Sequence, residues 1–279
     1  MKKNIFIATV LFASTLITLN SCKKKTEVDN ETQSVVDNAL CEQQFMAIAP
    51  TVNDRGGSPI QAEFRTAGCD FIWTPPANTA TNSVGEYTAG PRTFTVDYTG
   101  STCNEADDVK RAGKMYITSS HKWSAVKSMS IGTQPTVTVT VTFDGYMVGA
   151  VSYGGTVTVI KNNNVIQTKV ENGTCTSAGW PNGISYATDG FKTTEILPDG
   201  TAKIYGDSHG VNREGRSFTT TIPASNPIIK KRNCKWISSG QVSVTPDGFK
   251  TRTVNFGSGT CDDDATFTVD GQTIAFKLK

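Results

Sequence analysis

Histidine is scarce in this sequence, and the cysteines lack the spacing of a metal site. The 279 residues include two histidines, His121 and His209, and no Cys-x-x-Cys pair. Structural zinc sites need four nitrogen or sulfur ligands at short, regular spacings. We therefore expect neither a metal site nor a cofactor.

The sequence also has no excess of charge of one sign. It contains 27 basic and 25 acidic residues, and two of the lysines, Lys2 and Lys3, lie in the N-terminal segment that we expect to be removed. The mature chain would therefore carry 25 of each sign. Nucleic-acid binding needs a clustered basic surface, so we expect no nucleic-acid partner.

Long apolar runs are missing except at the N-terminus. The run from Ile5 to Leu19 follows two lysines, which is the layout of a secretory signal peptide. It ends in Leu19-Asn20-Ser21-Cys22, which resembles the lipobox of bacterial lipoproteins. The resemblance implies cleavage after residue 21 and acylation of Cys22, with palmitate as the chain type. Two or three acyl chains, at about 0.8 kcal/mol per buried CH₂, would anchor the protein firmly.

The anchor predicts an address in the cell envelope. A lysine at the second position after the acylated residue resembles lipoproteins of the outer membrane, at its periplasmic face or at the cell surface. The lipid anchor implies that the protein's first partner is the membrane. We predict a signal peptide at 1–21 and a lipidated tether with one helix at 22–63.

The helix is expected from Glu31 to Ala49. Cys41, Phe45 and Ile48 share one face at helical spacing, and Pro50 is expected to end the helix. The residues that follow Pro50 are rich in Asp and Gly and are expected to form a loop.

From about Phe64 the apolar period changes to two. Residues 136–143 alternate between Thr and an apolar residue without a slip, which predicts a strand with one buried and one solvent face. Asx-Gly pairs recur between such segments and tolerate the positive φ of tight hairpins. We predict an all-β body at 64–279, an antiparallel sandwich or extended meander.

An internal repeat is visible in this body. Residues 93–103 and 251–261 are identical at five of eleven positions, and Asp-Gly-Phe-Lys-Thr occurs at 189–193 and at 247–251. The repeat suggests two related units, about 64–170 and 171–279.

Six cysteines remain after Cys22, an even number that favours disulfides in an exported chain. Because the repeat places cysteines at equivalent positions, we predict the pairs Cys69–Cys103 and Cys234–Cys261. Cys41 and Cys175 either pair with each other or remain buried thiols.

Four stretches of the sequence resemble a group of uncharacterised envelope lipoproteins of Bacteroidetes-type bacteria. They are the lipobox, the helix segment 37–42 (Asp-Asn-Ala-Leu with a following Glu) and segments 212–218 and 234–261. The resemblance implies the fold and the address, and it supplies no catalytic residue.

The triplet Asp207-Ser208-His209 is the candidate for catalysis. After Gly206 it resembles the nucleophile block of Gly-Asp-Ser-Leu hydrolases, but the later Asp-x-x-His of those enzymes is missing. Neighbouring residues on a strand point to opposite faces, so Ser208 and His209 would not meet. We expect no catalytic residue and no enzyme activity.

Aromatic residues offer a weaker signal for binding. Trp73 lies two residues before Pro75 and Trp180 directly before Pro181, near predicted loops where a sugar could stack on them. Acidic residues after Cys103 and Cys261 lack the spacing of a calcium loop. We expect a binding or structural role in the envelope, with an unidentified envelope protein or a glycan as the partner. The alternatives are a carbohydrate-binding module and a serine hydrolase.

Overall fold

The computed structural model describes residues 29–56, 72–74, 80–99, 110–122, 136–162, 165–231, 234 and 236–278, with the backbone alone at 50–56 and 72–74. These residues form one helix, α1 (Gln33–Gly56), and fifteen strands. The first eight strands are β1 (Ile72–Thr74), β2 (Arg92–Asp97), β3 (Arg111–Ser119), β4 (Val137–Val148), β5 (Val151–Asn162), β6 (Val165–Thr176), β7 (Ile184–Thr188) and β8 (Lys192–Ile196). The other seven are β9 (Ala202–Val211), β10 (Ser217–Ile222), β11 (Ile228–Lys230), β12 (Ser239–Pro246), β13 (Arg252–Ser258), β14 (Asp264–Val269) and β15 (Gln272–Lys277).

All fifteen strands belong to one antiparallel sheet, in which most neighbours in space are also neighbours in sequence. Two positions are each shared by two short strands: β7 and β8 both lie between β6 and β9, and β10 and β11 both lie between β9 and β12. The second break contains Pro223 and Pro227, and proline has no N–H to give to the ladder. The predicted all-β meander is confirmed.

The alternation of Thr and Val in β4 gives the strand one buried and one solvent-facing side, as predicted. Val137, Val139 and Val141 are fully buried, whereas Thr138 is exposed and the following threonines are partly exposed. A β-bulge lies in the neighbouring strand β3, where the β3–β4 register shifts at Gly113. Gly113 has φ 73°, and a Cβ there would lie 2.1 Å from the Gly145 carbonyl oxygen, so only glycine fits.

The repeat is visible in backbone detail. Asp97 and Asn255 occupy equivalent positions at 93–103 and 251–261, and each side chain accepts a hydrogen bond from the backbone N–H two residues later, Thr99 and Gly257. The residues between them are buried in both copies. The two expected units are parts of one sheet, and β6 spans the boundary between them at residues 170 and 171.

The helix is longer than expected. α1 continues through Pro50 to Gly56, which corrects the prediction that Pro50 ends it and that a loop follows. A proline inside a helix removes one N–H donor, and α1 continues despite this loss. The predicted apolar face is confirmed, because Cys41, Phe45 and Ile48 are all buried.

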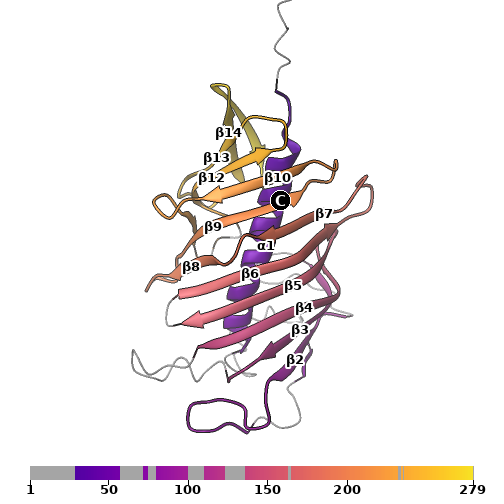
Figure 1. Ribbon diagram of the computed structural model, residues 1–279, viewed down its shortest axis with the longest axis vertical. Coiled ribbons are helices and arrows are strands. Elements are labelled where there is room, and N and C mark those ends of the chain that lie inside the picture. The colour runs from indigo at the N-terminus through magenta and orange to yellow at the C-terminus, as the bar shows by residue number, and fades with distance from the viewer. Residues whose placement is uncertain are drawn as a thin grey trace, which may run out of the picture.

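The helix is also buried on almost every side. Among residues 33–49, only Gln33, Val36, Gln44 and Ala47 retain partial exposure. α1 crosses the strands steeply on one face of the twisted sheet and contacts β5, β6, β7, β10 and β12 (Figure 1). Burial on all sides includes polar side chains of α1, and these need partners inside the protein.

Candidate functional site

Three cations of the sheet meet carboxylates on or just before α1. Arg252 begins β13, Arg213 lies in the β9–β10 turn, and Lys192 begins β8. Their partners extend from the residues just before α1 to the middle of the helix. These three contacts, which we call the helix-anchoring pairs, fix the position of α1 against the sheet.

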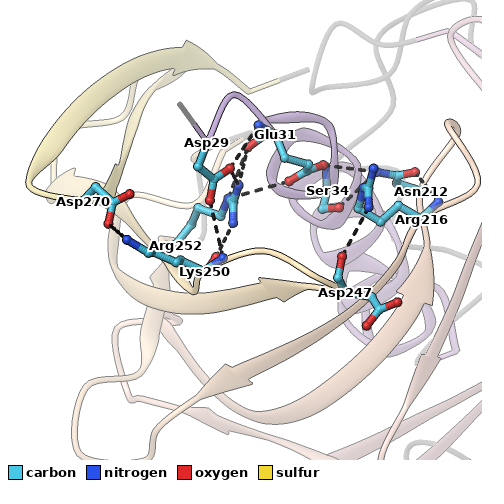
Figure 2. Close-up of polar contacts among 9 residues, drawn as sticks. All are labelled: Asp29, Glu31, Ser34, Asn212, Arg216, Asp247, Lys250, Arg252 and Asp270. Atoms are coloured by element: carbon cyan, nitrogen blue, oxygen red, sulfur yellow. Dashed lines mark hydrogen bonds and ion pairs between the residues drawn. The ribbon is translucent and has the colours of Figure 1, made fainter. Parts of the chain in front are cut away.

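The first pair lies at the start of the helix. The buried Arg252 guanidinium contacts the Asp29 carboxylate and donates to the Glu31 carbonyl from Nε and Nη2, at 3.1 and 3.0 Å (Figure 2). Its Nη1 donates to the Lys250 carbonyl. Arg252 therefore ties the segment that precedes α1 to the second repeat copy.

The first turn of the helix is capped in the same place. The Glu31 carboxylate accepts the N–H of Ser34 at 2.8 Å, which satisfies one of the donors left open at a helix start. Asn212 donates to the Ser34 hydroxyl at 3.0 Å and to Glu31 at 3.3 Å (Figure 2). The Asn212 oxygen accepts from the backbone of Arg216 at 2.9 Å, so the same amide also shapes the β9–β10 turn.

The second pair lies one turn further along α1. Arg213 donates to Asp37 from its Nε at 2.8 Å, from its Nη2 and from its backbone N–H at 2.8 Å. Asp37 is fully buried, and the guanidinium carbon of Arg213 lies 3.8 Å from the centre of the Trp180 ring. Arg213 thus holds both the helix and an aromatic ring in place.

The third pair is fully enclosed. Lys192 Nζ lies 2.5 Å from Glu42 Oε2, and neither side chain exposes more than 2% of its surface. The Tyr186 hydroxyl donates to the same oxygen at 2.8 Å. Burial and then the neighbouring Glu42 carboxylate raise the pKa of Tyr186, so its hydroxyl stays a donor.

A cavity of about 260 Å³ lies beside the second pair. It is bounded by α1, the β4–β5 turn, the segment that holds Trp180 and the end of β15. Most of the lining is apolar: Val36, Ala39, Leu40, Val148, Gly149, Ala150, Val151, Tyr153, Trp180, Phe276 and Leu278. Burial raises the pKa of Tyr153 far above its ordinary value, so this wall is uncharged.

Two cations also line the cavity, and both have carboxylate partners. Arg213 pairs with Asp37, and Lys277 Nζ lies 2.7 Å from an oxygen of Asp263 and 2.7 Å from one of Asp264. The cavity therefore has no excess positive charge to attract an anion. Its chemistry suits an uncharged apolar group.

Trp180, a predicted binding residue, is part of this cavity, and the sequence did not indicate its partners. Trp73 lies in β1 opposite Val96, and its side chain is outside the described residues. The acyl site Cys22 and the pair Cys69–Cys103 are also outside them. Cys234 and Cys261 form a disulfide, as the repeat predicts.

The hydrolase candidates do not meet. Ser208 is fully buried and hydrogen-bonds the Thr220 hydroxyl, whereas the His209 imidazole is about half exposed on the other face. His209 Nδ1 lies 2.6 Å from Asp189 Oδ1, and Asp207 pairs with Thr221 across the ladder. This geometry separates the nucleophile from the base, as strand alternation predicts.

The outer face of the sheet carries two rows of hydroxyl side chains. Each row has one residue per strand, in register and about 4.8 Å apart. The first hydroxyl row is Thr93, Thr118, Thr140 and Thr158. The second hydroxyl row is Thr221, Ser243, Thr253, Thr268 and Thr273.

The described residues contain neither a cluster of metal ligands nor a helical membrane span. No group of three or more His, Cys, Asp or Glu side chains in this part of the chain is placed to hold a metal. None of its helical residues forms a stretch with the length and apolar character that crossing a bilayer requires. Comparison of the chain with protein-family models, curated proteins and solved structures finds no match.

Proposed function

We propose that this chain is a lipid-anchored protein of the cell envelope that binds an uncharged apolar group in the cavity beside α1. The lipobox-like segment that ends in Cys22 supports the address. The cavity carries the binding proposal. An enclosed apolar cavity of about 150 Å³ is known to take up a benzene molecule, and this cavity is larger.

The position of the cavity favours binding over simple packing. Its walls come from α1 and from three other parts of the chain, and Arg213 holds the Trp180 ring at one of them. A cavity with fixed aromatic and aliphatic walls is pre-formed for a ligand, which lowers the cost of ordering on binding. A short aliphatic chain or a small uncharged aromatic molecule is the kind of ligand that fits.

A fluorescent probe tests the proposal. Phenylnaphthylamine, which is uncharged and apolar, is titrated into the mature chain carrying Cys22→Ser, which has no acyl group and needs no detergent. Ala150→Phe places a ring in the cavity from the exposed β4–β5 turn. We expect it to weaken probe binding about tenfold, or 1.4 kcal/mol.

The matched control is Ala275→Phe, the same change at an exposed position of β15 that does not line the cavity. It should leave the probe affinity unchanged. Equal affinities for Ala150→Phe and the parent protein would refute the cavity as the binding site.

A second candidate function is contact with a glycan through the outer face. The two hydroxyl rows favour it, because they present neutral donors and acceptors at a regular spacing across several strands. A neutral polysaccharide could hydrogen-bond along such rows. In a pull-down with insoluble glycans, Thr253→Lys combined with Thr268→Lys should abolish retention; retention unchanged by these substitutions would argue against this surface.

A further inference from the structure

Two cysteines meet where the middle of α1 lies on the sheet. The Sγ atoms of Cys41 in α1 and Cys175 in β6 are 3.3 Å apart, and both residues are fully buried. They are 134 positions apart in the sequence, so only the fold brings them together. A disulfide needs an S–S distance of about 2.05 Å, so the sulfur atoms would have to approach by little more than 1 Å.

The surroundings hold the two thiols face to face. Cys175 pairs with Tyr153 on one neighbouring strand and with Ile184 on the other. Phe45, one helical turn after Cys41, packs edge-on against Tyr153 of β5 at 6.0 Å and stacks on Tyr186 of β7 at 5.5 Å. Aromatic packing on both sides therefore fixes the helix and the strand at the height of the cysteines.

We propose that Cys41 and Cys175 form a disulfide that fastens α1 to β6. The two thiols lose two protons and two electrons, and one S–S bond forms. A disulfide of an oxidising partner, such as glutathione disulfide or an envelope oxidoreductase, accepts the electrons and protons and becomes two thiols. The same bond would form whether or not the cavity takes up a ligand.

The Cys41–Cys175 disulfide forms during folding. Burial raises the pKa of the Cys41 thiol, and the hydrogen-bonded Cys175 raises it further. The thiolate is the reactive form, so the enclosed pair reacts slowly once the protein is folded. The oxidant would meet these cysteines while α1 is docking, before the sheet covers them.

Tryptic mapping tests the proposal directly, because the sequence places each of the six cysteines that follow Cys22 on a different tryptic peptide. Cys41 lies on residues 26–55, Cys175 on 170–192, Cys234 on 233–235 and Cys261 on 253–277. The mature chain carrying Cys22→Ser is refolded with reduced and oxidised glutathione, alkylated in denaturant and digested without reductant.

The expected result is a cross-linked pair of peptides 26–55 and 170–192 that separates on reduction. The pair 233–235 with 253–277 reports that oxidation went to completion. The proposal is wrong if, in a sample with that second pair, peptides 26–55 and 170–192 are recovered alkylated, glutathionylated or joined to other cysteines. Cys175→Ser should return peptide 26–55 in a form that is not linked to 170–192.

Discussion

The segment Asp-Gly-Phe-Lys-Thr occurs twice, and the protein uses its two copies differently. Both copies make a similar turn, with φ 75° at Gly190 and 76° at Gly248. In the first copy, the side chain of Lys192 is fully buried against Glu42. In the second, the side chain of Lys250 is 63% exposed and pairs with Asp270 at the surface.

The second copy supplies its buried cation two residues later. Arg252 reaches the start of α1, whereas the equivalent position of the first copy is Thr194, a buried neutral residue. Each copy therefore delivers one cation to the helix from an inward-facing position. The local sequence determines the turn, and the position of α1 determines which residue is buried.

The largest expected effect is that of Lys192→Met. The substitution leaves the Glu42 carboxylate buried without its cation, which should lower the free energy of unfolding by about 3–5 kcal/mol. Lys250→Met, the same change in the other copy, should cost no more than about 1 kcal/mol because its ion pair is exposed. Urea unfolding measures both.

A double variant separates charge from packing. When Glu42→Leu is added to Lys192→Met, no unpaired charge remains, and much of the lost stability should return. If the two lysine variants unfold at the same urea concentration, the contrast between the copies has no energetic basis.

Arg252→Leu should have the next largest effect. It removes charge-assisted hydrogen bonds to Asp29 and the Glu31 carbonyl, each worth about 1.5–3 kcal/mol, near a helix end that solvent can partly reach. We expect a total loss of about 2–4 kcal/mol. Compared with the parent protein, the Arg252→Leu variant should show a larger increase in hydrogen exchange at residues 33–36 than at residues 45–48. Uniform opening along α1 would contradict the assignment of Arg252 to the helix start.

The phenylalanines of the two copies offer a smaller contrast. Phe249 lies between two guanidinium groups, with the Arg216 carbon 4.3 Å and the Arg252 carbon 5.4 Å from its ring centre. Phe191 is 38% exposed. Phe249→Leu should therefore cost about 1 kcal/mol of unfolding free energy from lost cation–π contacts, and Phe191→Leu should cost less. Thermal unfolding of the two variants side by side gives the comparison; a larger loss for Phe191→Leu would reverse it.

The smallest effect concerns pH. Hydrogen bonds from Thr99 and then Lys114 lower the pKa of Asp97 from 3.8 to about 2. Because the folded-state pKa is the lower one, the stabilisation is present above pH 3.8 and is lost as the pH falls towards 2. In the repeat of 93–103 at 251–261, Asn255 makes the same turn as Asp97, so Asp97→Asn should keep this turn. The substitution should reduce the fall in melting temperature between pH 4 and pH 2. An unchanged pH profile would show that Asp97 titrates alike in both states.

Local patterns predicted much of this fold. The Thr–Val alternation of β4, the hairpin glycines, the meander and the Cys234–Cys261 bond all follow from residues close in sequence or from the repeat. The length of α1 was predicted wrongly, because Pro50 is a strong local signal that the helix overrides.

The partners of α1 could not be predicted in the same way. Asp37 and Glu42 entered the sequence analysis only through the family resemblance, and their burial follows from the way the sheet packs on α1. One signal was available: Arg252 shares the inward phase of Val254 and Phe256, where a charge needs a buried partner. Nothing in the sequence showed that this partner would be the helix, more than 200 residues earlier.

Anomalous scattering from a soaked crystal tests the binding proposal most directly. Iodobenzene, an apolar ring with a strong scatterer, is diffused into crystals of the mature chain carrying Cys22→Ser. The account predicts an iodine peak in the cavity between Leu40, Trp180 and Phe276. A saturating soak that leaves this cavity without iodine, while iodine binds elsewhere on the protein, would contradict it.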